Sequence, residues 1–445
     1  MTCVVQLSAP WREPAEVLSA FAGEPWALGL VTGGRDARWS YVARAPSATL
    51  THRADDAGRP FARLRDLLGP PAAPSTDGPP FQGGVVGLAA YELGDHVEAL
   101  GLARQPDWPD LAAARYDALL AFDRQAGKVI AVGRAGDDDT AQARARAALG
   151  WLDAAPRAPR GGVLAGPLQA SDPTAYEAAV AQVVARIRAG EIFQANIARA
   201  WTSELALGVQ PFDLFARLLD QSAAPFAAYL RLPGLALVSN SPERFLQVRD
   251  GAAQTKPIKG TRPRGADPAS DAALAAELLA SDKDRAENLM IVDLMRNDLA
   301  RVCAPGSVKV PALWALESFA NVHHLVSTVT GALSPGRNAL DLLAAAFPPG
   351  SITGAPKVQA MKVIAELETP RGPYCGSLFW AGADGGFDSS VLIRTAACVQ
   401  TADGWRVEAR AGAGIVEGSD PHAERLETEA KIAALAKALT EAPPA

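Results

Sequence analysis

The sequence predicts an α/β protein in which hairpins of short strands alternate with long helices. Apolar segments at 118–123 and 128–132 flank a Gln-Ala-Gly turn, and extended segments flank Asp250-Gly251, a dipeptide typical of tight hairpins. Residues 281–301 repeat apolar side chains with the period of a helix. A chain of 445 residues can bury a large core, either as one α/β unit or as two to three domains.

The composition is that of a globular protein and gives no support for nucleic acid or membrane partners. Hydrophobic residues make up 49% and charged residues 21% of the chain, and the net charge is -6, whereas nucleic-acid-binding surfaces are basic. No apolar run approaches the length of a membrane span. The cysteines are scattered without a Cys-x-x-Cys pair, which predicts reduced thiols and a cytoplasmic location.

The first segment, residues 1–153, has the pattern of a scaffold. We expect a strand at 26–32, an apolar segment with a turn at each end at 83–94, and a helix at 137–152. No group of acidic, basic or nucleophilic residues in this segment resembles a catalytic constellation. Residues 154–171 are rich in Pro and Gly and are predicted to be a linker.

The second segment, residues 172–440, begins with a clear helix signal. Asp172 can cap the first turn of a helix that ends at a glycine. The residues that follow, 191–198, have the pattern of a strand. Gln194 and Asn196 are two residues apart in it, so their side chains share one face of the predicted sheet.

A carboxylate and an amine lie close together in the sequence of this segment. Glu243 follows a buried strand predicted at 235–238, and Lys259 follows the hairpin predicted at 247–256. Neighbouring strands would bring the two side chains close in space, as a reaction that needs a proton donor and a nucleophile requires. A salt bridge on a sheet is the alternative interpretation.

Two helices each carry a pair of acids. Asp284 and Glu287 are three residues apart in one predicted helix, and Glu424 and Glu427 have the same spacing in another, at 421–439. Residues with this spacing share one face of a helix. Such acids could together hold a hard divalent cation, for example Mg²⁺. Solvated helix faces are the alternative interpretation.

Three further stretches have features of a ligand site. The loop at 347–357 leads into a helix whose first N–H groups could face an anion. Arg394 lies in an apolar strand predicted at 389–397, where a cation needs an internal acid or a substrate carboxylate as its partner. The small residues at 411–416 would allow a ligand to lie against the backbone.

Short motifs occur in an order that is typical of one protein family. They are SPERF, PIKGTRPRG, DRAENLMIVDLMRND, HHLVS, GSITGAPK, IRT and GAGIV. Through them the chain resembles the chorismate-utilising enzymes, which include anthranilate, aminodeoxychorismate, isochorismate and salicylate synthases. The resemblance covers residues 172–440 closely and extends to Pro25-Trp26-Ala27 and residues 80–94. It implies two antiparallel sheets packed face to face, helices outside them, and an active site in a cleft.

The resemblance also implies how metal and substrate are held. Glu287 and Glu427 correspond to direct Mg²⁺ ligands, and Asp284 and Glu424 to acids that support the waters of the metal. The Mg²⁺ holds the ring carboxylate of chorismate.

Other residues are implied to contact the substrate directly. Arg394 and Tyr374 correspond to the pair that grips the enolpyruvyl carboxylate, which a guanidinium binds bidentately. Further residues that are implied to line the substrate are His324, Thr353, Gly412, Ala413, Gly414 and Lys431.

Two positions distinguish the branches of this family. Isochorismate and salicylate synthases have a water-activating lysine where this chain has Gln194, and an amide cannot serve as a general base. The PIKGT motif, which contains Lys259, resembles the aminodeoxychorismate synthases.

In that branch the lysine attacks C2 of chorismate, Glu243 protonates the departing C4 hydroxyl, and ammonia adds at C4 and expels the lysine. Lys259 must therefore be neutral and Glu243 protonated. We expect burial or nearby positive charge to lower the pKa of the lysine, and desolvation to raise the pKa of the acid.

The resemblance implies ammonia from a separate glutamine amidotransferase subunit, because no cysteine of this chain lies in a glutaminase-type turn. The implied product, 4-amino-4-deoxychorismate, leads to 4-aminobenzoate and folate. The alternatives are an anthranilate or aminodeoxyisochorismate synthase, and a non-catalytic protein that binds an effector. Some family members bind tryptophan, and Thr32, Pro225, Phe226 and Ala227 align loosely with that pocket.

Overall fold

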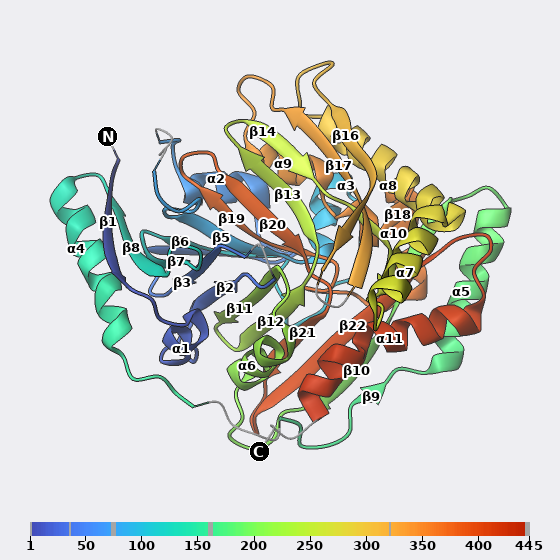
Figure 1. Ribbon diagram of the computed structural model, residues 1–445, viewed down its shortest axis with the longest axis horizontal. Coiled ribbons are helices and arrows are strands. Elements are labelled where there is room, and N and C mark those ends of the chain that lie inside the picture. Colours follow the sequence, from blue (N-terminus) through green and yellow to red (C-terminus); the bar gives the residue numbers. More distant parts are fainter. Residues whose placement is uncertain (1, 35–36, 73–76, 159–162, 320–321, 441–445) are drawn as a thin grey trace.

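Two antiparallel sheets pack against each other, and helices cover their outer faces (Figure 1). This arrangement confirms the predicted fold class. The structure is a computed structural model, and the residues that it describes are 2–34, 37–72, 77–158, 163–319 and 322–440. Part of the predicted linker, residues 159–162, lies outside the described residues.

The first sheet has 12 strands within the described residues. Strand β9 (Gln169–Ala170) pairs with β10 at the side of the main path. In spatial order the path is β1 (Cys3–Pro10), β8 (Lys128–Ala135), β7 (Ala118–Asp123), β3 (Trp39–Ala43), β2 (Leu28–Val31), β11 (Phe226–Leu232), β12 (Leu235–Ser241), β21 (Thr395–Gln400), β22 (Trp405–Ile415), β10 (Gln194–Glu204) and β18 (Gly354–Ala355).

The second sheet has 10 strands within the same described ranges. Strand β16 (Lys309–Ser318) pairs with β17 at the side of the main path. In spatial order the path is β15 (Ile258–Pro263), β17 (Val322–Ala332), β14 (Ala252–Thr255), β13 (Arg244–Arg249), β20 (Phe387–Val391), β19 (Ser377–Gly382), β5 (Gly84–Ala89), β6 (Leu111–Tyr116) and β4 (Ala48–His52).

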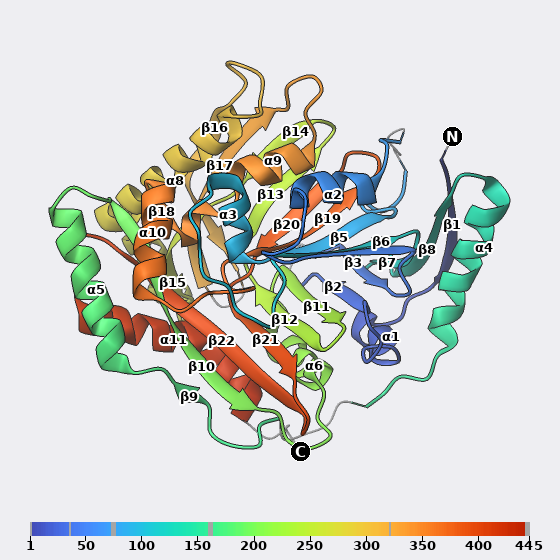
Figure 2. The same cartoon turned by 180° about the vertical axis from the view of Figure 1, so that it is seen from behind.

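Helices lie outside the two sheets, as Figure 2 shows for α5 and α10 from behind. No helix among the described residues has the length and apolar character needed to cross a membrane. The helices are α1 (Pro14–Ser19), α2 (Pro60–Leu68), α3 (Asp95–Glu98), α4 (Asp138–Leu149), α5 (Pro173–Arg188), α6 (Pro211–Ser222), α7 (Pro268–Ala280), α8 (Asp282–Ala300), α9 (Ala339–Ala346), α10 (Lys357–Leu367) and α11 (Pro421–Thr440), with short 3₁₀ turns at Tyr91–Gly94, Gly150–Asp153 and Gly350–Ile352.

The hydrophobic core is divided into layers by the sheets. Between the sheets, Leu237 and Leu230 of the first sheet pack in one cluster with Leu88 and Trp380 of the second. The outer face of the first sheet packs against α6 and α11, and the outer face of the second packs against α8 and α9. Each sheet is therefore buried on both faces, which explains its long apolar runs.

Both halves of the sequence contribute to both sheets. In the first sheet, β2 from the N-terminal segment pairs with β11 from the C-terminal segment. In the second, β5 pairs with β19. The predicted segments 1–153 and 172–440 thus share one core, and the boundary between them at 154–171 remains a prediction from the sequence.

Short sequence signals, such as helix caps and turn dipeptides, predicted the positions of several elements correctly. Asp172 caps α5 by accepting a hydrogen bond from the N–H of Thr174, and Ser281 caps α8 by accepting one from Asp284. The turn between β13 and β14 contains Asp250 and Gly251, with φ of 50° and 73°, as a tight hairpin requires. The strand predicted at 191–198 is wrong in its start, because β10 begins only at Gln194, beyond an exposed turn.

Candidate active site

Glu243 and Lys259 lie in the same region, but they are not carried by neighbouring strands as predicted. Lys259 lies on β15, which pairs with β17, and Glu243 lies between β12 and β13. The expected neighbouring strands are wrong, because β17 and β14 lie between β15 and β13. The two side chains are nevertheless close enough that each affects the pKa of the other.

Glu243 occupies an environment that favours the protonated acid. Its side chain is buried, and its Oε1 accepts a hydrogen bond of 2.7 Å from the hydroxyl of Ser351. Burial raises the pKa of Glu243, although the Ser351 hydrogen bond and the nearby Lys259 partly oppose the shift. Sequence reasoning missed Ser351, although it lies in the glycine-rich loop that was noted as a possible ligand site.

Lys259 occupies an environment that favours the neutral amine. Burial lowers its pKa, and the positive charge of Lys431 acts in the same direction. Glu287 and Glu243 oppose the shift without reversing it. A neutral amine beside a protonated acid is the combination that nucleophilic attack with departure of a poor leaving group requires.

Two amide side chains from β10 line the same region. Gln194 and Asn196 are both buried, and Nε2 and Oε1 of Gln194 have no hydrogen-bond partner among the described residues. A methyl group added at Gly414 would lie 2.9 Å from Nε2 of Gln194 and 3.4 Å from Nζ of Lys259. The glycine therefore keeps open a space that the amide and the amine both border.

A second glycine of β22 borders the space near Tyr374. A methyl group added at Gly412 would lie 3.0 Å from the hydroxyl oxygen of Tyr374. The carbonyl oxygen of Gly412 accepts a hydrogen bond of 2.9 Å from Nζ of Lys431. Ala413, between the two glycines, is fully buried. The structure thus gathers the predicted Tyr374 and Lys431 around residues 412–414 of strand β22.

The strand predicted at 389–397 is wrong. The chain leaves the second sheet at the end of β20 and enters the first sheet at β21, and Arg394 lies in the bend between them with φ of 51°. A continuous apolar run does not reveal such a crossing. Arg394 is exposed, and no acid among the described residues forms an ion pair with it, so its guanidinium remains available to an external anion.

His324 and Thr353 are both buried near these groups. The Nδ1 atom of His324 lies 2.9 Å from the hydroxyl of Thr261, within hydrogen-bond distance. Burial and the positive charge of Arg394 lower the pKa of His324 to about 4, so the ring is neutral near neutral pH. Thr353 donates its hydroxyl hydrogen to the carbonyl of Pro349 at 2.8 Å.

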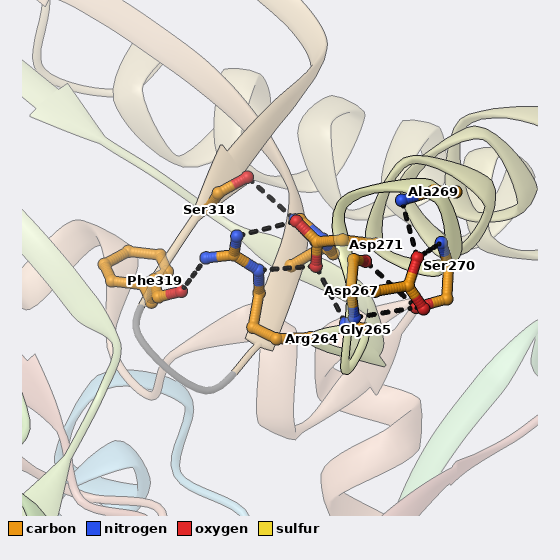
Figure 3. Close-up of polar contacts among 9 residues, drawn as sticks. Arg264, Gly265, Asp267, Ala269, Ser270, Asp271, Ser318 and Phe319 are labelled. Atoms are coloured by element: carbon orange, nitrogen blue, oxygen red, sulfur yellow. Dashed lines mark hydrogen bonds and ion pairs between the residues drawn. The ribbon is translucent and has the colours of Figure 1, made fainter.

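A network of ion pairs fastens the strands that carry Lys259 and His324. Arg264 donates to both carboxylate oxygens of Asp271 and to the carbonyl of Phe319 (Figure 3). His323 contacts the same Asp271 at 2.9 Å and the hydroxyl of Ser318 at 2.7 Å. The end of β15, the start of α7 and the β16–β17 hairpin are therefore tied together.

Arg371 is a structurally important cation that sequence reasoning missed. Its side chain is fully buried and forms an ion pair of 2.9 Å with Glu368. It also donates hydrogen bonds to the carbonyls of Asn196 and Ile352. This one guanidinium thereby connects β10 to the loop that carries Ser351. No sequence pattern marked Arg371, because its ion pair with Glu368 looks like an ordinary local contact and its backbone partners lie in distant parts of the chain.

Comparison with known proteins identifies the family of this chain. Residues 30–437 match a family model described as chorismate binding enzyme. The chain belongs to the chorismate-binding enzyme family.

Two curated relatives and one solved structure show its place in the family. Aminodeoxychorismate synthase component 1 of Klebsiella aerogenes is 40% identical over 97% of this chain and 98% of its own length. Anthranilate synthase component 1 of Streptomyces coelicolor is 40% identical over 93% of this chain and 82% of its own length. The structure of anthranilate synthase component I from Streptococcus pneumoniae TIGR4 has a TM-score of 0.78 and 28% identity, and the match covers 92% of this chain and 94% of that one.

In this chorismate-binding enzyme, α8 carries one of the two predicted acid pairs. Asp284 accepts a hydrogen bond of 3.3 Å from Arg262. Burial raises the pKa of Glu287, Lys259 and Lys283 oppose the shift, and Asp284 adds to it. The negative charge of Asp284 thus adds to the raised pKa of Glu287, and a bound cation would relieve this repulsion.

The second acid pair lies on α11. Glu424 accepts a hydrogen bond of 2.6 Å from the hydroxyl of Ser419, and Glu427 forms an ion pair of 2.6 Å with Lys431. Glu427 also raises the pKa of Glu287 on the other helix. Among the described residues, no three His, Cys, Asp or Glu side chains are gathered closely enough to hold a metal ion. The donor set, carboxylate oxygens from two helices, fits a hard cation such as Mg²⁺.

The four residues predicted for an effector line a separate cavity of about 360 Å³. They are Thr32, Pro225, Phe226 and Ala227. Trp39 adds an aromatic wall, and the charged side chains of Arg244 and Asp388 lie at the border. The cavity lies between β2 and β11 of the first sheet and strands of the second, and its volume suits a small organic molecule.

We predict that His324 makes folding sensitive to acid. Its folded pKa of about 4 lies below the value of 6.5 that is usual for histidine, so the unfolded chain takes up the proton first as the pH falls. The stability contribution of the neutral ring is complete above about pH 6.5 and is lost as the pH falls toward 4, by up to about 3 kcal/mol.

The free energy of unfolding, measured in urea between pH 4 and 7, tests this prediction. The variant His324→Gln should lose less stability in acid than the unmodified protein. His422, whose side chain is 64% exposed, offers the control His422→Gln, which should follow the unmodified protein. Identical pH profiles for His324→Gln and the unmodified protein would contradict the prediction.

Proposed function

We propose that this enzyme aminates chorismate at C4 with ammonia to form 4-amino-4-deoxychorismate. The observation that carries the proposal is the pairing of a buried Glu243, with raised pKa, and Lys259, with lowered pKa, beside the amide of Gln194. The near full-length similarity to aminodeoxychorismate synthase component 1 supports it. The product would serve 4-aminobenzoate and folate biosynthesis.

The proposed reaction consists of two displacements. The neutral amine of Lys259 attacks C2, the ring double bond shifts, and the C4 hydroxyl leaves as water with the proton of Glu243. Ammonia then adds at C4, the double bond shifts back, and Lys259 leaves as the neutral amine. The carboxylate of Glu243 takes back a proton from the newly added ammonium group, so the enzyme returns to its starting state.

The remaining site residues would bind and orient the substrate. Arg394 and Tyr374 offer a guanidinium and a hydroxyl to the enolpyruvyl carboxylate. His324 and Thr353 would lie against the substrate without exchanging protons with it, because both are buried and already hydrogen-bonded.

We also propose Mg²⁺ as the cofactor. Glu287 and Glu427 would bind the metal directly, and Asp284 and Glu424 would accept hydrogen bonds from its waters. When bound, Mg²⁺ supplies positive charge for the ring carboxylate.

Ammonia would come from a glutamine amidotransferase subunit. The relatives are named component 1, which implies a second component. The cysteines Cys303, Cys375 and Cys398 are buried, and burial raises the pKa of each thiol, which is the opposite of what a glutaminase nucleophile needs. The unpaired cysteines also favour a cytoplasmic location.

The cavity of about 360 Å³ between the sheets favours a second, binding function. We propose that it holds tryptophan, with the indole between Phe226 and Trp39 and the charged groups at Arg244 and Asp388. Equilibrium dialysis with tryptophan should show one molecule bound per chain, and Phe226→Ala should weaken it. Phe193→Ala, at a residue that is 69% exposed, is the control. Absence of binding by the unmodified protein would refute this second proposal.

The identity of the product is the main test of the proposed function. The purified chain, given chorismate, Mg²⁺ and ammonium at alkaline pH, should form 4-amino-4-deoxychorismate and release no pyruvate. Glutamine should not replace ammonium until an amidotransferase subunit is added. Mass spectrometry and a coupled pyruvate assay measure both products. Fluorescent anthranilate with one pyruvate per turnover would assign the anthranilate branch instead, and turnover of glutamine by the chain alone would reveal a second active site.

A lysine substitution tests the nucleophile. We expect Lys259→Gln to lower the rate of amination by at least about 10³-fold, because the variant retains the fold but lacks the attacking amine. Lys309→Gln, at an exposed lysine at the start of β16, should leave the rate unchanged. Initial rates of product formation, with thermal unfolding as a check of folding, give the comparison. Near-normal turnover by Lys259→Gln would remove this residue from the mechanism.

The metal proposal is tested at the two acids that would bind it directly. Glu287→Gln and Glu427→Gln each keep the side-chain shape but remove a negative charge, so each should raise the Mg²⁺ concentration for half-maximal activity by at least about tenfold. Asp293→Asn, at a residue of α8 whose side chain is 65% exposed, should have no effect. Full activity of the unmodified enzyme in excess chelator would overturn the assignment.

A further inference from the structure

Asn196 has a buried polar group that the proposed reaction leaves unused. The residue lies on β10 and is 6% exposed, and its Nδ2 has no hydrogen-bond partner among the described residues. An unpaired buried N–H group costs about 1–3 kcal/mol. Such a group in a folded protein calls for a ligand or another explanation.

Hydrogen bonds hold the backbone of Asn196 in place. The N–H of Asn196 donates a hydrogen bond of 2.9 Å to the carbonyl of Thr353, and its carbonyl accepts one of 2.6 Å from Arg371. Because both backbone groups are engaged, the position of the residue on β10 is fixed. The side-chain Nδ2 is nevertheless left without a partner among the described residues.

The amide points to the space above Gly412. A methyl group added at Gly412 would lie 2.8 Å from Nδ2 of Asn196 and 3.0 Å from the hydroxyl oxygen of Tyr374. Gln194, by contrast, lies over Gly414 and beside Lys259. The two amides of β10 thus face different parts of the site, and Asn196 belongs to the part that contains Tyr374.

Two side-chain groups that can donate hydrogen bonds, Nδ2 of Asn196 and the hydroxyl of Tyr374, meet beside Gly412. Nζ of Lys431 reaches the carbonyl of Gly412 at 2.9 Å and is paired with Glu427 at 2.6 Å. The nearby acid Glu368 is already paired with Arg371 at 2.9 Å. Two buried donors that converge on one point suit an anionic ligand, because a carboxylate accepts several hydrogen bonds at once.

We propose that Nδ2 of Asn196 donates a hydrogen bond to the substrate carboxylate that the Tyr374 hydroxyl contacts, the enolpyruvyl carboxylate of chorismate. Asn196 is then a substrate-binding residue that neither the motifs nor the reaction chemistry identified. This inference rests on the proposed function, which brings chorismate into the site. It concerns the affinity for the substrate and not the identity of the product.

Chorismate binding to three variants tests the inference. Asn196→Leu keeps the branched shape of the side chain but removes the donor, and Asn196→Asp keeps the shape but replaces the donor by a negative charge. Thr202→Val, at a partly buried residue further along β10, is the control. The dissociation constant is measured by equilibrium dialysis with Mg²⁺ and without ammonia, and KM and kcat are measured separately with ammonia.

We expect Asn196→Leu to bind chorismate roughly 10- to 100-fold more weakly, since a hydrogen bond to a charged group is lost. Asn196→Asp should bind more weakly still, because it adds repulsion, and both should raise KM more than they lower kcat. Thr202→Val should bind normally. If Asn196→Leu does not fold, the near-isosteric Asn196→Asp still decides the question.

Two results would overturn the inference. Normal chorismate affinity of Asn196→Leu would show that the amide only fills space, and affinity of Asn196→Asp equal to that of the unmodified protein would show that no carboxylate lies beside it. Failure of the proposed function has a different signature. In that case the product would be other than 4-amino-4-deoxychorismate in the unmodified enzyme, whatever the affinities of the variants.

Discussion

The withdrawal of water from Lys259 and Glu243 is the constraint on which the site depends. In water an amine and a carboxylic acid at this separation would exchange a proton and form an ion pair. Burial opposes both charges, so it lowers the pKa of the lysine and raises that of the acid. The pair can then remain a neutral nucleophile beside a proton donor, provided that the surrounding structure keeps the water out.

Buried ion pairs next to the site supply that structure. Arg371 connects β10 to the 3₁₀ turn of the glycine-rich loop. At the other end of this loop, Nζ of Lys357 lies 2.7 Å from Oδ2 of Asp298 and 2.6 Å from the carbonyl of Ala346. The loop between these anchors carries Ser351, which bonds Glu243. Removing one partner of such a pair would leave a buried charge uncompensated, and the loop that these pairs anchor also holds Glu243 through Ser351.

The sequence predicts the positions of helices and strands along the chain better than it predicts which strands pair with each other. Helices with local caps, such as those that begin after Asp172 and Ser281, were correct because the signal and the structure involve the same few residues. The pairing of β15 was wrong because β17, which inserts beside it, comes some 60 residues later in the chain. The bend at Arg394 was missed because an apolar run looks the same whether it stays in one sheet or crosses to the other.

Prediction of the candidate site was limited in the same way, by contacts between segments that are distant in the sequence. The motifs singled out Glu243, Lys259 and the glycines of β22, because their residue types carry the chemistry. Ser351 was not singled out, and Asn196 was noted only because it shares a face with Gln194, since the significance of both residues lies in contacts that the fold creates between distant segments.

In the proposed reaction, the proton inventory of the site favours ammonia over water as the nucleophile. Addition of water needs a base, and until Glu243 has given up its proton the groups at hand are poor ones. Glu243 favours its protonated form, the amide of Gln194 has no useful basicity, and His324 has a pKa of about 4. Ammonia needs no base to become nucleophilic, because its lone pair is already available in the neutral molecule. Under the proposed function, a site poor in general bases therefore favours an amine nucleophile over water.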